Sequence, residues 1–581
     1  MEGLLPDTMP EHTQHEPPFE PRPPATGPQG QLVHPAALDQ LTRLTPRLYH
    51  VGEHAWCLVG NGLSNQSFVR APEGIIAIDT GDCVEEMQAA LSELRKVTDL
   101  PVVACIYTHF HYVNGTQALL TEHPHQERST FAIYGHADID RNRARFGGEI
   151  APRSNKGIVH QFGTQLPSEG EDALLHCGLG LHLRNPDHAP FTPGYVAANH
   201  LIDTQQTTQV AGLEVQLSPA PADTDDSLTI WFPQLNLCIN NLFWPALFNI
   251  YAIRGEQYRD PQTLLQGMDH IIQLQPAQLI GTHGPPLQDL NDHAPLIAYR
   301  DSIQFLWDQT VRRLNLGDTM DEAAHNVQLP AHLGQTYLTG QFYGVAEHHV
   351  KQIHAGLFGW FDGDESQLFP LPTSERNDRL IAGFGGREVV HQQASDALAQ
   401  GDLRWALELA TWLVRSTAVS AQDRTLLAAV LRQLAQHTIS ANVRNWSLTR
   451  ALDLEGSLDL KRHHQHRFSA RQVLGESPTR FIPVLRVLLV PDRAVDVNTE
   501  VAWHFASGER CGLLVRNQVA IATSGEDADL TLGLSHETWA DVLSGQRNLW
   551  QCVDEGLVSV SGDSDQLARF CSAFDIPGLQ R

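Results

Sequence analysis

Apolar and polar positions along the chain first predict regular structure near residue 75. The apolar run at 75–78 ends at Asp79 and a Thr-Gly-Asp turn, as expected for a buried strand. Apolar residues then recur at helical spacing, at Val84, Met87, Leu91, Leu94 and Val97. A second apolar run at 102–107 predicts another strand. This order predicts a parallel pair with a right-handed crossover, and side chains that follow such strands gather at one edge of the sheet.

The pattern between about residues 300 and 460 is helical. Two amphipathic segments are broken at Gly401-Asp402, and a third follows them. Their apolar positions are Val389, Leu398, Trp405, Leu409 and Leu413, then Leu427, Val430, Leu431 and Leu434. Consecutive helices of this kind pack or associate more often than they catalyse, so we expect a solenoid-like or dimerising unit.

The pattern changes again near residue 465. An apolar, helix-like segment begins at Phe481. Short apolar runs separated by turn residues follow at 501–505, 511–515, 519–522 and 530–534. We expect an antiparallel meander with a helix from about Glu537 to Leu543, which together make a small α+β domain. The simplest interpretation of its apolar strands is a packed core.

Composition and charge exclude several classes of protein. The chain has 581 residues, of which 42% are apolar, and eight prolines fall in residues 1–30. That proline-rich start predicts a disordered arm. A net charge of −27 argues against nucleic acid or anionic membrane as partners. The sequence has no apolar stretch approaching about 18 residues, so we expect no membrane span. Residues 1–30 also lack a cationic start before an apolar run, so we expect a cytoplasmic protein without a secretory signal.

Two histidines separated by one residue follow the strand predicted at 102–107. His109 and His111 lie in the segment Tyr-Thr-His-Phe-His-Tyr-Val-Asn-Gly, on a loop that leaves the sheet. Both imidazoles can turn onto one ion there, and neutral imidazole is a good ligand for zinc. The alternative is a pair of surface or hydrogen-bonding histidines.

Two later segments favour the metal site. The carboxylates Asp223, Asp225 and Asp226 precede an apolar run. One of them is the expected third metal ligand; the alternative is that they form a solvated turn. The residues alone leave open which of the three binds metal. The apolar pair 279–280 is followed by His283, which begins a Gly-Pro turn. At the end of a strand, this histidine is well placed to face an active site.

These residues resemble the alkylsulfatase branch of the metallo-β-lactamase superfamily, and the resemblance runs nearly end to end. It rests on the strand ending at Asp79, the Thr-His-Phe-His loop, the Ala-Ile-Arg-Gly segment at 252–255 and the helical segments between 299 and 409. The fold that it implies is an α/β catalytic domain of αββα metallo-β-lactamase type, an all-α dimerisation domain and a small α+β sterol-carrier-protein-like domain. The expected domains are a Pro-rich arm at 1–40, a catalytic domain at 41–297, a helical domain at 298–464 and the last domain at 465–581.

The resemblance implies a zinc-dependent hydrolase that releases sulfate from linear alkyl sulfate esters, with a homodimer sheltering the site and the last domain holding apolar chains. This sequence departs from the family pattern His-x-His-x-Asp-His at Val113 and Asn114. The family's bridging glutamate falls at Asn240 or Asn241. We therefore expect one zinc per chain, bound by His109, His111 and Asp223, while His283 remains from the second metal position.

The resemblance also implies roles for other residues. Asn114, Asn241 and a protonated His283 are expected to donate hydrogen bonds to an oxyanion. Arg254 is the expected sulfate clamp, because a guanidinium matches two sulfate oxygens; the alternative is an ion pair with Asp260. Two further residues fall on family segments that contact sulfate, namely Asn249 and Thr164, the latter in Phe-Gly-Thr where the family has Tyr-Gly-Asn.

Two hypotheses of different class therefore stand. The first is a mono-zinc alkylsulfatase of altered activity, favoured by the retained histidines, Asp223 and Arg254. The second is a catalytically impaired relative that acts as a dimeric amphiphile-binding protein, favoured by the changes at Val113, Asn114 and Asn241. A histidine-rich metal store is disfavoured, because the 30 histidines are dispersed along the chain.

Overall fold

The structure, a computed structural model, describes residues 22–122, 131–334 and 336–581. The described chain divides into two units, one made of residues up to 142 with 156–460, and the other of 143–155 with 461–581. The segment 143–155 thus joins the C-terminal part of the chain, although it lies within the predicted catalytic domain. The predicted boundaries at 297 and 464 stay predictions.

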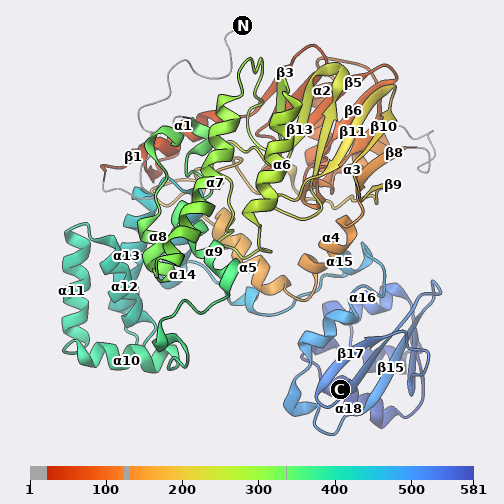
Figure 1. The fold of residues 1–581 in the computed structure, drawn as a ribbon. Coiled ribbons are helices and arrows are strands. Elements are labelled where there is room, and N and C mark those ends of the chain that lie inside the picture. The colour runs from red at the N-terminus through yellow and green to blue at the C-terminus, as the bar shows by residue number, and fades with distance from the viewer. Residues whose placement is uncertain (1–21, 123–130, 335) are drawn as a thin grey trace. The chain divides into compact units, whose positions relative to one another are not determined.

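The first sheet of the larger unit carries the predicted strand–helix–strand. In the described residues it has seven strands in the order β3-β4-β5-β6-β7-β8-β9. These are β3 (Arg47–Val51), β4 (Ala55–Val59), β5 (Gln66–Ala71), β6 (Gly74–Ile78), β7 (Val102–Ile106), β8 (Ala132–His136) and β9 (His200–Ile202). Helix α2 (Val84–Leu94) joins β6 to β7, and these two strands are parallel, which confirms the expected crossover (Figure 1).

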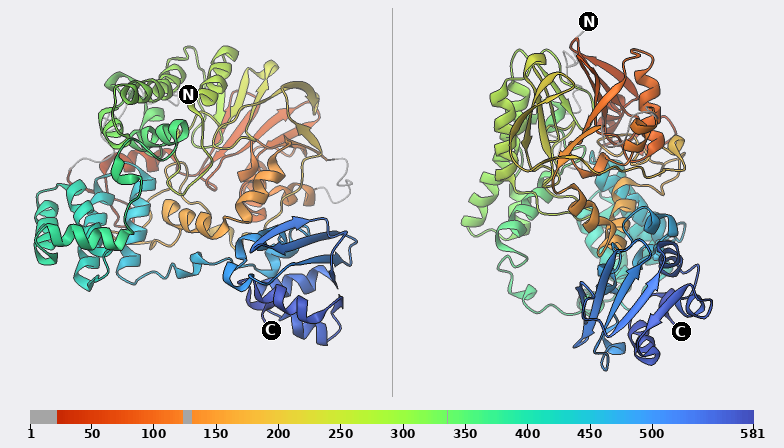
Figure 2. Two further views of the ribbon diagram at one scale, coloured as in Figure 1. Left: turned by 60° about the horizontal axis from the view of Figure 1, so that its bottom comes forward. Right: turned by 90° about the vertical axis from the view of Figure 1, so that its right-hand side faces the viewer.

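A second sheet packs face to face with the first. Its order in the described chain is β10-β11-β12-β13-β14. The strands are β10 (Gln206–Val210), β11 (Leu213–Pro219), β12 (Leu228–Phe232), β13 (Leu237–Asn240) and β14 (Gln278–Gly281). Ile76 and Ile106 of the first sheet share one buried cluster with Leu217 and Ile230 of the second. The right-hand view of Figure 2 shows the red-to-orange sheet and the yellow sheet side by side, with helices outside them.

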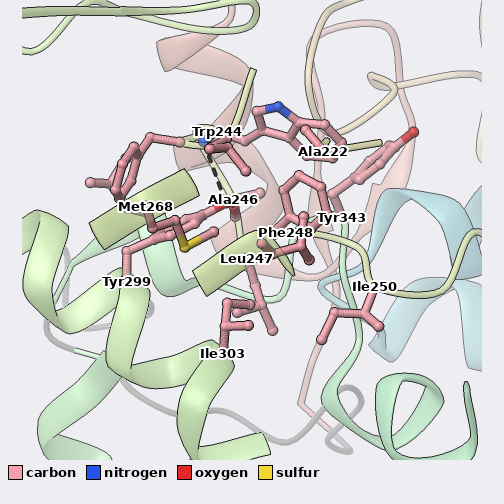
Figure 3. Close-up of a cluster of buried hydrophobic side chains, with 14 of the residues drawn as sticks. Ala222, Trp244, Ala246, Leu247, Phe248, Ile250, Met268, Tyr299, Ile303 and Tyr343 are labelled. Atoms are coloured by element: carbon pink, nitrogen blue, oxygen red, sulfur yellow. Dashed lines mark hydrogen bonds between the residues drawn. The ribbon is translucent and has the colours of Figure 1, made fainter. Parts of the chain in front are cut away.

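A second core lies under helices α6 (Pro261–Leu274) and α7 (Ala294–Asn315). Trp244, Phe248, Met268, Tyr299 and Ile303 belong to this core (Figure 3). The buried hydroxyl of Tyr299 donates a hydrogen bond to the carbonyl of Ala246 at 3.1 Å. Helix, sheet, sheet and helix layers confirm the expected αββα arrangement. A shorter helix of this part is α3 (Thr116–Thr121), while α4 (Ile139–Gly147) and α5 (Ala151–Phe162) each have residues in both units.

The rest of the larger unit is helical, as predicted. Its helices are α8 (Met320–Asn326), α9 (Ala346–Phe358), α10 (Thr373–Gly383), α11 (Arg387–Ala399), α12 (Leu403–Val414), α13 (Ala421–His437) and α14 (Ala441–Leu454). Val390, Leu409 and Leu431 lie in the core that α10 to α14 share, whereas Ala323 of α8 and Val350 of α9 pack into the core under α6 and α7. Across the described residues, every helix is too short or too polar to traverse a lipid bilayer.

The second unit contains one sheet and several short helices. Its strands are β15 (Thr499–Phe505), β16 (Arg510–Arg516), β17 (Val519–Thr523), β18 (Leu530–Leu534) and β19 (Val558–Ser561), and its helices α15 (Ala470–Leu474), α16 (His536–Ser544), α17 (Leu549–Asp554) and α18 (Ser564–Ser572). β15 to β17 form the expected antiparallel meander, but β18 pairs in parallel with β15. The meander prediction is wrong for β18, because alternation of apolar residues locates a strand without choosing its neighbour.

The N-terminal arm differs from the prediction where it is described. Residues 1–21 lie outside the described residues, whereas 22–40 contain β1 (Ala25–Thr26), β2 (Leu32–Val33) and the start of α1 (Pro35–Arg43). Proline at the first helical position is compatible with a helix start. Val33 and Ala37 pack on Leu175, so a contact distant in sequence orders this segment.

Candidate metal centre

The His-x-His loop is anchored between the ends of three strands. It leaves β7 and forms a short 3-10 turn at Phe110–Tyr112. The Phe110 N–H donates to Asp226 Oδ2 at 2.9 Å, and the Leu228 N–H donates to the Thr108 carbonyl at 2.8 Å. The Thr80 N–H donates to the Tyr112 carbonyl at 2.8 Å. The loop is therefore held on both sides by backbone and carboxylate contacts.

A hydrogen-bonded chain fixes the orientation of the His109 ring. The hydroxyl of Thr108 donates to Asp79 Oδ2 at 2.6 Å, and the Thr108 N–H donates to Asp79 Oδ1 at 2.8 Å. The same hydroxyl lies 2.9 Å from His109 Nδ1 and accepts its proton. The lone pair of His109 is then on Nε2, the tautomer that a metal ligand needs. Burial raises the pKa of Asp79 to about 7.

Three ligand atoms converge at this loop. His109 Nε2 lies 3.1 Å from His111 Nδ1, His111 Nδ1 lies 3.1 Å from Asp223 Oδ2, and His109 Nε2 lies 3.6 Å from Asp223 Oδ2. Tetrahedral zinc with bonds of about 2.0–2.1 Å places its ligand atoms about 3.3–3.4 Å apart. The three side chains, hereafter the metal triad, thus fit one face of a tetrahedral site. Their number and chemistry support a metal cofactor.

The structure distinguishes the three candidate carboxylates. Asp223 joins the two histidines, whereas Asp226 accepts the Phe110 N–H and so supports the loop. Asp225 accepts hydrogen bonds from Arg141 and Asn142, at 2.5 and 2.7 Å. Three carboxylates that are close in the sequence therefore make three different sets of contacts in the fold.

The protonation states in the triad suit a cation. Burial lowers the pKa of His109 to about 3, so its imidazole is neutral at neutral pH. Burial alone raises the pKa of Asp223, but His109, His111 and Arg259 together hold it well below its ordinary value. A buried carboxylate therefore stays ionised beside a neutral imidazole.

Asn241 supports Asp223 from behind. Its Nδ2 donates to Asp223 Oδ1 at 2.5 Å and to Ser227 Oγ at 3.2 Å. Its Oδ1 accepts from Trp244 Nε1 at 3.2 Å and from Thr282 Oγ1 at 2.6 Å. Both ends of the Asn241 carboxamide thus bind protein groups. Asn241 is therefore placed to hold the carboxylate of Asp223 in position. The neighbouring candidate, Asn240, instead accepts backbone N–H groups of the following turn.

Arg259 is a residue of this centre that the sequence analysis missed. Its buried guanidinium donates from Nε to the carbonyl of Asp223 at 3.1 Å. Nη1 donates to the carbonyl of Asn249 at 2.6 Å and also to Asn249 Oδ1. Asn249 is thus joined to the triad through Arg259. Nothing in the local pattern marks Arg259, which directly precedes the residue that caps α6.

Arg254 lies near the triad, and its carboxylate partner differs from the one considered from sequence. Its Nη2 pairs with Glu256 Oε1 at 2.5 Å, while Asp260 caps the start of α6. Burial disfavours its charge, but Glu256, Tyr343, Asp223 and Tyr112 outweigh this and raise the pKa of Arg254. A permanently charged guanidinium therefore lies within electrostatic reach of Asp223.

His283 stands beside the triad without joining it. Burial lowers its pKa to about 4, and Nδ1 donates to the carbonyl of Leu63 at 2.9 Å. The structure therefore favours a neutral His283 over the expected protonated one, because burial outweighs the opposing effect of Asp223 on its pKa. The His283 ring meets the rings of Tyr112 and Trp244 edge-on, at centroid distances of 5.5 and 5.4 Å.

The structure does not bring Asn114 or Thr164 into the triad. Asn114 exchanges backbone hydrogen bonds with Gly81 and Gly194, and its side chain is half-buried. Thr164 is exposed after Gly163. Val113 is fully buried, and its apolar side chain offers no ligand atom.

An αββα fold with two histidines and a carboxylate converging at the sheet edge is the arrangement expected of a metal-dependent hydrolase. Residues 319–457 match the family model described as alkyl sulfatase dimerisation, and residues 469–579 match the one described as alkyl sulfatase C-terminal. The linear primary-alkylsulfatase of Pseudomonas sp. (strain ATCC 19151) is 31% identical over 523 residues, which cover 87% of this chain and 98% of that protein. The chain therefore belongs to the alkylsulfatase family, and the expected class of sulfuric ester hydrolase is confirmed.

Other relatives agree over most of the chain. The (R)-specific secondary-alkylsulfatase of Pseudomonas sp. is 26% identical over 570 residues, covering 94% of this chain and 82% of that protein. The solved structure of the stereoselective inverting sec-alkylsulfatase Pisa1 from Pseudomonas sp. superposes with a TM-score of 0.83 at 22% identity, covering 97% of this chain and 93% of that one. This likeness supports the fold from the αββα domain to the C-terminal unit. The sterol-carrier-like character of the last domain stays a prediction.

Proposed function

We propose that the protein hydrolyses linear alkyl sulfate esters and uses one zinc ion bound by His109, His111 and Asp223. The observation that carries the proposal is the convergence of their three ligand atoms, which lie 3.1 to 3.6 Å apart. The family assignment gives the ester class, and the relative named a linear primary-alkylsulfatase supports a linear substrate. Two nitrogens and one carboxylate oxygen suit zinc with an open fourth position.

The residues around the triad have distinct roles in this proposal. A zinc ion bound there supplies a Lewis acid that polarises the ester and activates water. Thr108 and Asp79 orient His109, while Asn241 and Arg259 hold Asp223 in place. Arg254 binds the sulfate oxygens and supplies the local positive charge that a chain of net charge −27 needs for an anionic substrate. Roles for Asn114 and Thr164 stay predictions.

His283 offers the remaining proton acceptor of the site. Because Nδ1 donates to Leu63, Nε2 carries the lone pair. We assign His283 the role of a neutral base or hydrogen-bond acceptor next to the reacting groups. It lies outside the group of ligand atoms that converge within 4.8 Å, so the zinc proposal does not depend on it.

The helical region supports a homodimer as the working form. Several large apolar side chains between 357 and 371 are exposed, among them Trp360 at 67% and Phe369 at 95%. They fall inside the match to the alkyl sulfatase dimerisation model. A second copy of the chain is the occupant that this match favours.

The second candidate function is binding of amphiphiles without turnover. It is favoured by Val113, which cannot ligate a metal, and by Asn241, whose carboxamide is fully engaged. In that case the apolar strands of the C-terminal domain would hold alkyl chains, and the triad would be a remnant. Metal content and turnover, measured together, separate the two functions.

The test compares the wild-type protein with His111→Ala. We expect the wild type to release sulfate from dodecyl sulfate, and His111→Ala to lose the zinc of the triad and at least about 100-fold in rate, because a ligand is removed. His136→Ala is the matched control, since His136 ends a strand of the same sheet and contacts its neighbour Asp138, through the Asp138 N–H at 3.1 Å and the carboxylate at 3.8 Å. Zinc without turnover in the wild type would establish the binding protein, and zinc content unchanged by His111→Ala would refute the site.

A further inference from the structure

A second group of metal-ligating side chains lies apart from the triad. Cys83, Glu86 and His188 each offer one ligand atom, and the three atoms lie within 4.8 Å of one another. All three residues are buried, with exposed fractions of 1%, 2% and 5%. They share no residue with the triad, and the roles derived above do not use them.

The local sequence explains why these side chains meet. Cys83 is the N-cap of α2 and Glu86 lies one turn later, so that the two share a face of the helix. His188 ends a 3-10 turn, Pro186–His188, which the side chain of Asn185 caps. The Sγ of Cys83 lies 4.0 Å from the carbonyl oxygen of His188, which places that turn over the start of α2.

An unpartnered nitrogen points to a missing ligand. The Nδ1 of His188 is buried and has no hydrogen-bond partner among the described residues. Other buried ring nitrogens of the described residues also lack a partner, among them both nitrogens of His349. What sets His188 apart is that it lies together with two further metal-ligating side chains, Cys83 and Glu86. A buried polar atom without a partner is uncommon in native proteins and calls for an ion or a water molecule.

The carboxylate of Glu86 is held rigidly at this position. Gln66 Nε2 donates to Oε1 at 2.8 Å, and the Asp82 N–H donates to Oε2 at 3.2 Å. A Cβ on Gly62 or Gly81 would come within 2.2 or 2.4 Å of the same carboxylate oxygen. Two glycines therefore leave room for a carboxylate that is fixed before any ligand arrives.

We propose that Cys83, Glu86 and His188 form a second metal site, which takes zinc or a similar borderline divalent cation. Thiolate, carboxylate and neutral imidazole are all zinc ligands, and two negative charges balance the ion in a buried place. The proposal goes beyond the proposed function, because this cation would stabilise the turn into α2 rather than act on the substrate. The chain would then hold one zinc in the triad and a second cation here.

Without metal, the same groups would be uncharged. Burial raises the pKa of Cys83 to about 12 and that of Glu86 to about 8. A binding cation would displace both protons, as is usual for thiolate sites. The plain alternative is three buried neutral side chains packed together, and the experiment must separate these two states.

Cobalt(II) substitution distinguishes a metal site from three packed neutral side chains, because a cobalt–thiolate bond absorbs in the near ultraviolet. The triad contains no thiol, so a cobalt ion bound there does not give this band. We expect the band in the cobalt-loaded full-length wild type and in His111→Ala, and we expect Cys83→Ser to abolish it. Cys571→Ser is the matched control, since Cys571 is equally buried but belongs to the C-terminal core. His188→Gln should weaken cobalt binding at this site by at least about tenfold.

Absence of the band from the wild type at saturating cobalt would overturn the proposal, as would its persistence in Cys83→Ser. An unchanged band and affinity in His188→Gln would do the same. None of these measurements needs turnover. A catalytically inactive protein would therefore leave this inference intact, and failure of the second site would leave the proposed hydrolase intact.

Discussion

Thr108 connects the buried carboxylate of Asp79 to the imidazole of His109, and its contacts leave Nε2 of His109 facing His111. Its hydroxyl donates to Asp79 and accepts from His109 Nδ1. Groups that orient a ligand in this way contribute to metal affinity although they do not touch the ion.

Thr108→Val should therefore lower zinc affinity by about 10–100-fold, because His109 loses the acceptor for its Nδ1 proton. Chelator competition measures the affinity. Thr108→Ser restores the hydroxyl and should bind zinc as the wild type does. Equal affinity of the valine and serine variants would show that the hydroxyl does not orient the ligand.

In the proposed function, Arg254 binds the sulfate group of the substrate. Arg254→Gln should lower kcat/KM for dodecyl sulfate by about 10–100-fold, since a hydrogen bond to a charged group contributes about 1.5–3 kcal/mol. Zinc content should stay unchanged. Arg300→Gln is a suitable control, because Arg300 forms an ion pair with Asp269 on helix α6. A loss of zinc in Arg254→Gln would instead assign the residue to the structure of the centre.

At the scale of elements, hydrophobic spacing was sufficient to predict β6, α2 and β7. Each consists of residues whose period matches its structure, and the chirality rule for crossovers then fixes their arrangement. The spacing was not sufficient for β18, whose partner is chosen by packing. The spacing also failed to predict that the segment around α1 is ordered, because this depends on contacts with Leu175, which is distant in sequence.

His176 links α1 to the segment that covers it and makes stability depend on pH. Its Nε2 donates to the Ala37 carbonyl, and burial lowers its pKa to about 4 from an ordinary 6.5. Between pH 4 and 6.5 the unfolded chain binds more protons than the folded one, so stability falls as the pH drops through this window.

We expect this one group to reduce the free energy of unfolding by about 2 kcal/mol from pH 7 to pH 5. Denaturant unfolding of the wild type and of His176→Gln at both pH values measures the effect. The glutamine variant should lose less stability on acidification by that amount. An identical pH dependence in both proteins would contradict the burial of a neutral His176.

At the scale of the whole molecule, the proposed homodimer would bury the exposed apolar residues between 357 and 371. Phe369→Asp should raise the Kd of the homodimer at least about 100-fold, because burying one phenylalanine contributes about 1.5–3 kcal/mol and a symmetric interface contains it twice. Sedimentation velocity over a range of concentrations measures this. Ile297→Asp is the control, being exposed but outside residues 319–457. A variant as dimeric as the wild type would place the interface elsewhere.

The sequence by itself determined the strands and helices that have clear periods, the paired histidines after β7 and the family. These depend on neighbours along the chain, and residue spacing records them directly. Only the tertiary structure decided that Asp223 rather than Asp225 joins the histidines, that Arg259 supports it, and that His283 is buried. His111 and Asp223 are 112 residues apart, and their 3.1 Å contact exists because two sheets pack face to face. Packing also sets the burial that shifts each pKa, and no local pattern contains that information.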